Sequence, residues 1–333
     1  GRMKIEQDSA ELYTGVRHGF TLGSPIGLII QNLDWPNWKD IMDATIPDEN
    51  IGKITLPRPG HADLAGVMKY GFDDIRNVIE RSSARETTMR VALGSICRKL
   101  LEDLDIHVAS YVTQVHNIKD TNESYNYEVK KINKQADQSV IRTLNKNIEN
   151  DMINAITRAQ KNGDTVGGQF KILISGVPYG LGSYISWSKK LNAKLAESIC
   201  SINAIKGVSF GANNVSDSLG SQLHDEIEYK KNQFTRTNNN AGGIEGGMSN
   251  AQTIIINATM KPLSTLTKPL KSADINTKEK KLAHKERTDS CAVPAAGVIA
   301  ESMACIVIAD AILEKFGGDS MGQLLEHFKS AKY

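Results

Sequence analysis

The chain has 333 residues, and 40 lysines and arginines against 38 aspartates and glutamates give a net charge of +2, which exerts no general attraction on nucleic acid or membranes. The aromatic content of 6% also argues against an RNA-binding protein, and 40% hydrophobic residues are typical of a soluble globular one. No apolar run approaches the roughly 20 residues needed to cross a bilayer, and the start is not a signal peptide. Four cysteines without metal-type spacing indicate reduced core thiols in a cytoplasmic protein.

The first third of the chain is predicted to hold strands and then helices. Residues 5 to 31 have the composition of strands, with a turn at Val16–Gly19 and an apolar, β-branched run at Ile26–Ile30. A loop with a short helix follows. The spacing of apolar residues then predicts two helices, Asp73–Glu80 and Ser83–Leu104.

The remainder alternates strands and helices. Strands are predicted at Val108–Val115, Lys171–Ser175, Gly207–Phe210 and Ile254–Ile256. Helices are predicted at Val140–Gln160, Leu191–Ile199 and Pro294–Glu314, the last one buried and stopped by Gly317–Gly318. Residues 117–165 and 212–240 are polar, and we expect mobile segments there. Because no clear linker and no repeat interrupts the pattern, the sequence predicts a single α+β domain over residues 1–333.

The segment Arg81–Glu86 has the composition of an anion receptor. Two hydroxyls, of Ser82 and Ser83, lie between the guanidinium groups of Arg81 and Arg85, directly before a long helix. Ser83 and Glu86 have the spacing of a capping box, and the first turn of a helix offers unpaired N–H groups and partial positive charge. A phosphate or carboxylate fits there. On these residues alone, an ordinary helix start with solvated arginines is an equal alternative.

The segment Arg58–Asp63 places a histidine in a constrained turn. Pro59 and Gly60 restrict the backbone and let it turn, which holds the imidazole of His61 in one place. An imidazole can supply a proton to a departing oxygen at neutral pH. The alternative is a helix-capping or core histidine, and the neighbouring arginine and aspartate bring the two interpretations level.

A glycine-rich segment spans Asn240–Asn250, with four glycines in six positions. Such density lets the backbone approach a flat or phosphorylated ligand and offer its amides. The pattern is not a Rossmann fingerprint, because no suitable helix follows. A flexible surface loop is the alternative, but Met248 and the strand after it favour an ordered loop and a site.

Two further segments place cations beside polar side chains. Lys261, followed by Pro262 and two hydroxyls, has the means to bind an anion, although a solvated basic face is the more common use of such a segment. Arg287 has the charge to bind an anion, and Asp289 can accept a proton. Alternatively, Asp289 or Ser290 only caps the buried C-terminal helix. The sequence shows no catalytic triad, glycosidase-type carboxylate pair or zinc ligand set.

Taken in order, these segments resemble the chorismate synthase family, most closely its bacterial, monofunctional branch. The resemblance runs through nearly the whole chain and rests on Arg58–Asp63, Arg81–Thr87, Gly176–Ser183, Ala204–Gly207, Asn240–Asn250, Met260–Pro262 and Asp289–Ala296. Each segment is weak by itself, whereas the ordered set is specific.

The resemblance implies a reaction and a setting. The reaction is the 1,4-elimination of phosphate from 5-enolpyruvylshikimate 3-phosphate, which gives chorismate in the last step of the shikimate pathway. Reduced FMN is the implied cofactor; the protein supplies positioning and charge. The resemblance further implies an α+β sandwich of antiparallel sheets enclosing helices, a cytoplasmic homotetramer and an external source of reduced flavin. It implies no nucleic-acid or membrane partner.

The resemblance also implies roles for individual residues. His61 would protonate the flavin or maintain the required charge state, and Asp289 would help remove the ring proton through the flavin. Arg85 would bind the anionic substrate. The implied FMN-binding residues are Arg81, Ser82, Ser83, Asn203, Ala204, Gly246, Lys261, Pro262, Leu263, Ser264, Thr265 and Arg287.

The beginning of the chain departs from the family pattern. Family members open with a Gly-Glu-Ser-His-Gly segment that carries a second histidine, followed by an arginine-rich stretch, whereas this sequence opens at Gly1–Met3. Either the given sequence omits residues of the protein, or the protein lacks one acid and some phosphate-binding arginines. As the sequence stands, we expect weak or absent turnover from this form, even if the flavin site survives. Two alternatives stay open: a non-catalytic flavin- or phosphate-binding protein, and a flavin reductase that uses a nicotinamide cofactor such as NADPH.

Overall fold

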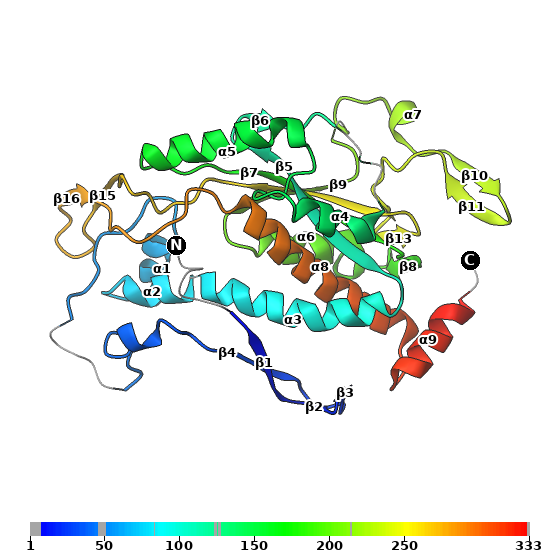
Figure 1. Cartoon of the computed structure of the whole chain (residues 1–333), viewed down its shortest axis with the longest axis horizontal. Coiled ribbons are helices and arrows are strands. Elements are labelled where there is room, and N and C mark those ends of the chain that lie inside the picture. Colours follow the sequence, from blue (N-terminus) through cyan, green and yellow to red (C-terminus); the bar gives the residue numbers. More distant parts are fainter. Residues whose placement is uncertain are drawn as a thin grey trace. The chain divides into compact units, whose positions relative to one another are not determined.

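The computed structural model describes residues 8–45, 51–82, 84–122, 125, 128–213 and 215–331 (Figure 1). Contacts divide the chain into two compact units. Unit 1 comprises Gly1–Leu93, Asn162–Asp164 and Ser264–Asp289, and unit 2 comprises Gly94–Lys161, Thr165–Leu263 and Ser290–Tyr333. The named strands pair antiparallel in both units, and helices accompany them, so the predicted α+β class is confirmed.

Unit 2 is built on a five-stranded antiparallel sheet. Its order is β6 (Ile118–Lys119), β5 (His107–Val115), β7 (Gly168–Ser175), β14 (Ile254–Met260) and β9 (Ile205–Phe210). Alternate residues of β7 are buried, because successive side chains of a strand point to opposite faces and one face of this sheet lies on the core. The four predicted strands of this region are confirmed, each within a few residues.

The core of unit 2 forms where helix α8 (Val293–Phe316) packs on β5 and β7 beside α6 (Leu191–Cys200) (Figure 1). By length and composition α8 is apolar enough to cross a bilayer, with a mean hydropathy of 2.0, so the expectation that no apolar run approaches that length is wrong. However, 61% of its most apolar window is buried inside the protein. The predicted stop is confirmed, since Gly317 has φ 60° and its N–H donates to the Leu313 carbonyl.

The polar segments contain regular structure. Residues 117–165 include α4 (Val129–Ala136) and α5 (Lys146–Lys161), where one helix was predicted over Val140–Gln160. That helix starts late because Arg142 takes a left-handed conformation, with φ 57°. Residues 212–240 include the short helix α7 (Gly220–Leu223) and a hairpin of two strands, β10 (Ile227–Lys230) and β11 (Gln233–Arg236).

Three short strands and two short helical elements complete unit 2. The strands β8 (Tyr179–Gly182), β12 (Ile244–Glu245) and β13 (Met248–Asn250) form a second sheet. The helix α9 (Met321–Ser330), which was not predicted, is capped by the Ser320 hydroxyl, and a 3-10 turn covers Trp187–Lys189.

Unit 1 contains small two-stranded sheets and helices. The strands are β1 (Ala10–Thr14) with β4 (Gly27–Ile30), β2 (Val16–Arg17) with β3 (Phe20–Thr21), and β15 (Lys271–Ala273) with β16 (Lys280–Leu282). The helices are α1 (Asp63–Tyr70), α2 (Arg76–Arg81) and the first half of α3 (Ala84–Glu102), and a 3-10 turn covers Trp35–Asn37. The predicted turn after β2 is confirmed by the positive φ of His18 and Gly19.

The cysteines occupy different environments, and all four are free. Cys305 is buried on α8, as predicted for a core thiol, and Cys97 and Cys291 are partly buried. Cys200 is exposed, because it is the last residue of α6. The prediction of a core position is therefore wrong for Cys200.

Candidate active site

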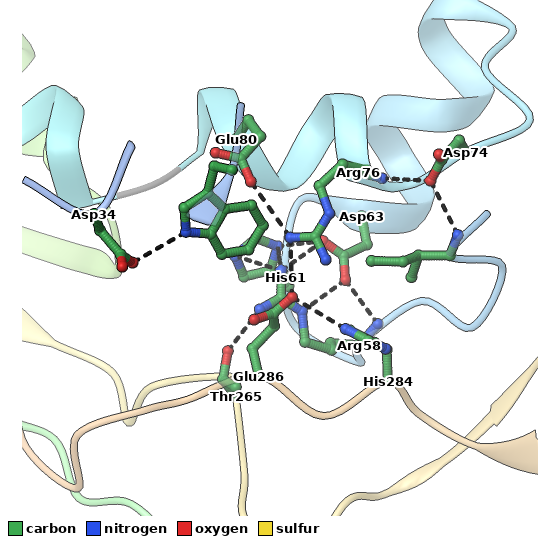
Figure 2. Close-up of polar contacts among 12 residues, drawn as sticks. Asp34, Arg58, His61, Asp63, Asp74, Arg76, Glu80, Thr265, His284 and Glu286 are labelled. Atoms are coloured by element: carbon green, nitrogen blue, oxygen red, sulfur yellow. Dashed lines mark hydrogen bonds and ion pairs between the residues drawn. The ribbon is translucent and has the colours of Figure 1, made fainter. Parts of the chain in front are cut away.

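A buried ionic cluster holds His61 just before α1 (Figure 2). Asp63 is 0% exposed and Arg58 is 6% exposed. The Asp63 carboxylate accepts hydrogen bonds from the Arg58 backbone N–H (2.9 Å), Nε (2.8 Å) and Nη2 (3.0 Å). His61 Nδ1 lies 2.5 Å from Asp63 Oδ1. One carboxylate thus binds the guanidinium in the bidentate geometry that is strongest for such pairs, and also holds the imidazole.

The charge of this cluster is fixed by the same contacts. Burial alone would raise the pKa of Asp63, but the hydrogen bonds from His61 and Arg58 outweigh burial and hold that pKa well below its usual range. Asp63 is therefore ionised throughout the neutral range. The side chain of His61 is 21% exposed, and the N-terminal cap of α1 is Ala62 without a side-chain bond. The helix-capping interpretation of His61 is wrong.

Two segments about 200 positions apart in the sequence meet at this cluster. Arg58 Nη1 donates to Thr265 Oγ1 at 2.9 Å, and Ser264 Oγ donates to the Gly60 carbonyl at 2.7 Å. The histidine turn and the two hydroxyls that follow Lys261 and Pro262 are therefore neighbours within unit 1. Both segments can be recognised in the sequence, but nothing in the sequence indicates that they are in contact.

A second ionic group in unit 1 holds the segment before Arg287. Glu286 Oε1 lies 3.1 Å from Arg76 Nη1 and 3.0 Å from His284 Nε2 (Figure 2). The Arg76 guanidinium also lies over the Trp38 ring, 5.1 Å from its centroid. This group was not predicted from the sequence, because its residues are spread over positions 38 to 286 and none of them belongs to a motif.

Arg287 and Asp289 are both exposed in unit 1. The alternative in which Asp289 or Ser290 only caps α8 is wrong, since the cap residue is Ala292 and no side chain caps it. The Ser290 carbonyl instead accepts the Val166 N–H at 2.8 Å. Asp289 therefore does not serve as a helix cap, and both Arg287 and Asp289 are exposed to solvent.

The arginine-serine segment lies where α2 ends and α3 begins. Arg81 is the exposed last residue of α2, and the Ser82 N–H donates to the Val78 carbonyl at 3.0 Å. Ser83 lies outside the described residues, and with it the predicted capping box. Arg85 donates to Asp8 Oδ1 at 2.6 Å and to the Gln31 carbonyl at 3.2 Å. The predicted substrate-binding arginine therefore already holds a carboxylate.

In unit 2 the structure brings two of the predicted cofactor segments together. The Lys261 N–H donates to the Ala204 carbonyl at 2.9 Å, and Ala204, next to Asn203, has a left-handed φ of 69°. The Leu263 carbonyl accepts a hydrogen bond from Thr165 Oγ1 at 2.7 Å. Asn203, Ala204 and the segment Lys261–Leu263 are therefore adjacent.

The glycine-rich segment is an ordered hairpin of β12 and β13, so the flexible-loop alternative is wrong. Gly242, Gly243 and Gly247 have positive φ, and a Cβ there would collide with backbone or with the Lys190 side chain. Gly246 also has positive φ, 59°, yet its Cβ would meet only Met248 Cε at 3.8 Å. Three of the four glycines serve packing, and Gly246 alone among the four borders open space.

Within the described ranges, no group of three or more histidine, cysteine, aspartate or glutamate side chains is arranged to hold a metal ion.

Comparison with known proteins identifies the family. A family model described as chorismate synthase matches residues 1–313. The chain belongs to the chorismate synthase family. It is 49% identical to a chorismate synthase of Enterococcus faecalis over 334 residues, which covers 99% of this chain and 86% of that protein. It is 50% identical to one of Alkaliphilus metalliredigens, with 99% and 87% covered.

The solved structures agree with this assignment. A crystal structure of a chorismate synthase matches with a TM-score of 0.77 at 34% identity, covering 97% of this chain and 83% of that one. The predicted resemblance, fold class and enzyme class are thus confirmed: the family consists of lyases that act on a phosphate bond of a small-molecule substrate and need reduced flavin.

Proposed function

We propose that this protein uses reduced FMN to eliminate phosphate from 5-enolpyruvylshikimate 3-phosphate, as a cytoplasmic homotetramer supplied with reduced flavin from outside. The observation that carries this proposal is the cluster of Arg58, His61 and Asp63, in which Arg58 donates to Thr265. The Gly60 carbonyl of the same turn accepts a hydrogen bond from Ser264. This arrangement places a proton-exchanging ring beside two hydroxyls. When bound, reduced FMN supplies the electron density that weakens the breaking C–O bond.

The anionic groups of cofactor and substrate need fixed cations. We assign FMN contacts in unit 1 to Arg81, Ser82, Ser83, Ser264, Thr265 and Arg287. Arg81 and Arg287 are exposed, so their guanidinium groups can reach phosphate in bidentate geometry. Arg85, which donates to the Asp8 carboxylate, would exchange it for a carboxylate of the substrate, because a guanidinium binds either one in the same way.

In unit 2 we assign FMN contacts to Asn203, Ala204, Gly246, Lys261, Pro262 and Leu263. The residues present fit such a group. A Cβ on Gly246 would meet only Met248 Cε at 3.8 Å, so no backbone crowds that turn. Lys261, whose backbone N–H donates to the Ala204 carbonyl, supplies a cation for an anionic ligand.

Two residues would handle protons. His61 is the proposed donor to the flavin, since its ring is half-buried and held by Asp63. Asp289 is exposed and is proposed to help remove the ring proton through the flavin. The remaining work of the protein is to position charge around the breaking bond.

Anaerobic phosphate release from 5-enolpyruvylshikimate 3-phosphate with photoreduced FMN tests the proposal. Release should require reduced FMN at whatever rate it occurs, and His61→Ala should lower that rate by about 10²–10⁴-fold. His224→Ala, an exposed histidine of unit 2, is the matched control and should keep the native rate. Release without flavin would contradict the proposal. NADPH oxidation without added reductant would instead favour the flavin reductase, and flavin binding without release would favour the non-catalytic binder.

A further inference from the structure

We propose that Asp63 is a positioning residue for His61: the buried carboxylate fixes the imidazole as the tautomer protonated on Nδ1, which makes Nε2 the nitrogen that exchanges the proton. The first half of this inference stands on the cluster alone. The second half, that the exchange serves flavin chemistry, rests on the proposed function.

The hydrogen-bond chemistry of Asp63 selects the tautomer. An ionised carboxylate can only accept hydrogen bonds, so a ring nitrogen 2.5 Å from Oδ1 must carry the hydrogen. Three donors of Arg58 hold the carboxylate, two on Oδ2 and one on Oδ1, and no part of Asp63 is exposed. The carboxylate therefore cannot turn away from the ring, and His61 Nδ1 stays protonated.

The contacts of Arg58 with the ring are compatible with the same tautomer. Arg58 Nη2 lies 3.1 Å from His61 Nδ1 and 3.3 Å from Nε2. A guanidinium only donates, so the ring nitrogen that accepts from it needs a free lone pair. Because Nδ1 already donates to Asp63, that nitrogen is Nε2. The contact with Asp63 thus selects an imidazole with hydrogen on Nδ1 and a lone pair on Nε2, and the contact with Arg58 is compatible with that tautomer.

The same pair of neighbours suits the ring to proton exchange. When Nε2 takes up a proton, the positive ring is attracted by the Asp63 carboxylate and repelled by the Arg58 guanidinium, and the Nε2 contact with Arg58 is lost. The ring proposed to exchange the proton is therefore in contact with one anion and one cation. The carboxylate of Asp74 differs from that of Asp63. Its Oδ1 accepts the backbone N–H groups of Ile54 and Arg76, and among the described residues it makes no bond to a catalytic side chain.

Asp63→Asn is the informative variant because it should move the hydrogen of the neutral His61 ring from Nδ1 to Nε2. The Arg58 backbone N–H and Nε both need an acceptor at the Oδ2 position, so the amide oxygen takes that place. The amide NH₂ then faces His61 Nδ1 as a donor and forces the hydrogen of the ring onto Nε2. In serine proteases the equivalent aspartate-to-asparagine change acts through the wrong tautomer in this way.

Nitrogen-15 NMR of the full chain labelled at histidine tests the tautomer directly, with the His61 signal assigned by its loss in His61→Gln. Neutral His61 should carry hydrogen on Nδ1 in the native protein and on Nε2 in Asp63→Asn, whereas Asp74→Asn should leave it unchanged. Hydrogen on Nε2 in the native protein overturns the proposal. That result does not depend on Asp63→Asn, so it decides the matter even if Asp63→Asn does not fold.

A double-mutant cycle tests whether Asp63 acts through His61. Asp63→Asn should lower kcat by about 10²–10⁴-fold while FMN affinity stays within about twofold of native. In the His61→Ala background it should lower kcat no further. If the losses in kcat caused by the two substitutions multiply in the double mutant, Asp63 acts independently of His61 and the proposal is overturned. Loss of flavin-dependent release in every protein, with the native tautomer as predicted, would count against the proposed function alone.

Discussion

The buried carboxylate of Glu301 should be a costly side chain to remove from unit 2. Glu301 lies on the mainly apolar helix α8 and is 3% exposed. Its Oε1 accepts from Ser110 Oγ (2.6 Å) and Arg142 Nη2 (3.1 Å), and its Oε2 from Arg98 Nη2 (2.7 Å) and Asn133 Nδ2 (2.8 Å). One side chain therefore ties α3, α4, β5 and the turn before α5 to the central helix.

Glu301→Ala leaves two arginines facing a cavity without their shared counter-charge. Removing one partner of a buried ion pair costs about 3–5 kcal/mol. Arg142 keeps a contact with Asp137, and Arg98 keeps the Val108 carbonyl, so the lower end applies, about 3 kcal/mol. At roughly 2–4 °C per kcal/mol for a chain of this size, Tm should fall by about 6–12 °C.

Guanidinium unfolding and differential scanning calorimetry measure this loss. Asp310→Asn is the matched control on the same helix: Asp310 is 69% exposed, pairs with Lys194 at 3.3 Å, and should change the free energy of unfolding by less than about 0.5 kcal/mol. If Glu301→Ala unfolds within about 1 kcal/mol of the native protein, the reasoning about this cluster is refuted.

Three further outcomes are expected. Gly247→Ala should lower the free energy of unfolding by about 1–3 kcal/mol in a denaturant titration, because φ is +90° and a Cβ meets a lysine side chain; native stability would contradict this. Burial raises the pKa of Cys305 to about 12, so a maleimide at pH 8 should label the exposed Cys200 and spare Cys305, as mass spectrometry can establish; equal labelling would contradict the core position. A hydrogen bond from Thr55 lowers the pKa of Asp274 to about 2, so its stabilising effect is complete above about pH 4 and is lost as pH falls through 2; Asp274→Asn should lose less Tm across that range than the native protein, and equal losses would count against it.

Features encoded over a few neighbouring residues could be predicted from the sequence. The turn after β2 and the end of α8 each depend on a glycine with positive φ, and both were located correctly. The contact between Arg58 and Asp63 is likewise local, since five positions separate them. In these places the chemistry of neighbouring residues and their spacing are sufficient to predict the local structure.

Features that join distant residues could not be predicted. Thr265 reaches Arg58 across 207 positions, and Glu301 gathers partners from residues 98 to 142. The late start of α5 depends on the left-handed Arg142, whose conformation is fixed by its bonds to Glu301 and the Ser110 carbonyl. When tertiary contacts set the conformation of a residue, the neighbouring sequence does not predict that conformation.

The central claim is that this protein binds FMN and that an anionic substrate strengthens the binding, and fluorescence titration of oxidised FMN with and without 5-enolpyruvylshikimate 3-phosphate tests it most directly. FMN should bind much more tightly once the substrate is present, and Arg287→Ala should weaken that binding while Lys280→Ala, an exposed residue of β16, should not. The same FMN affinity with and without substrate, or no difference between the two variants, would contradict the account.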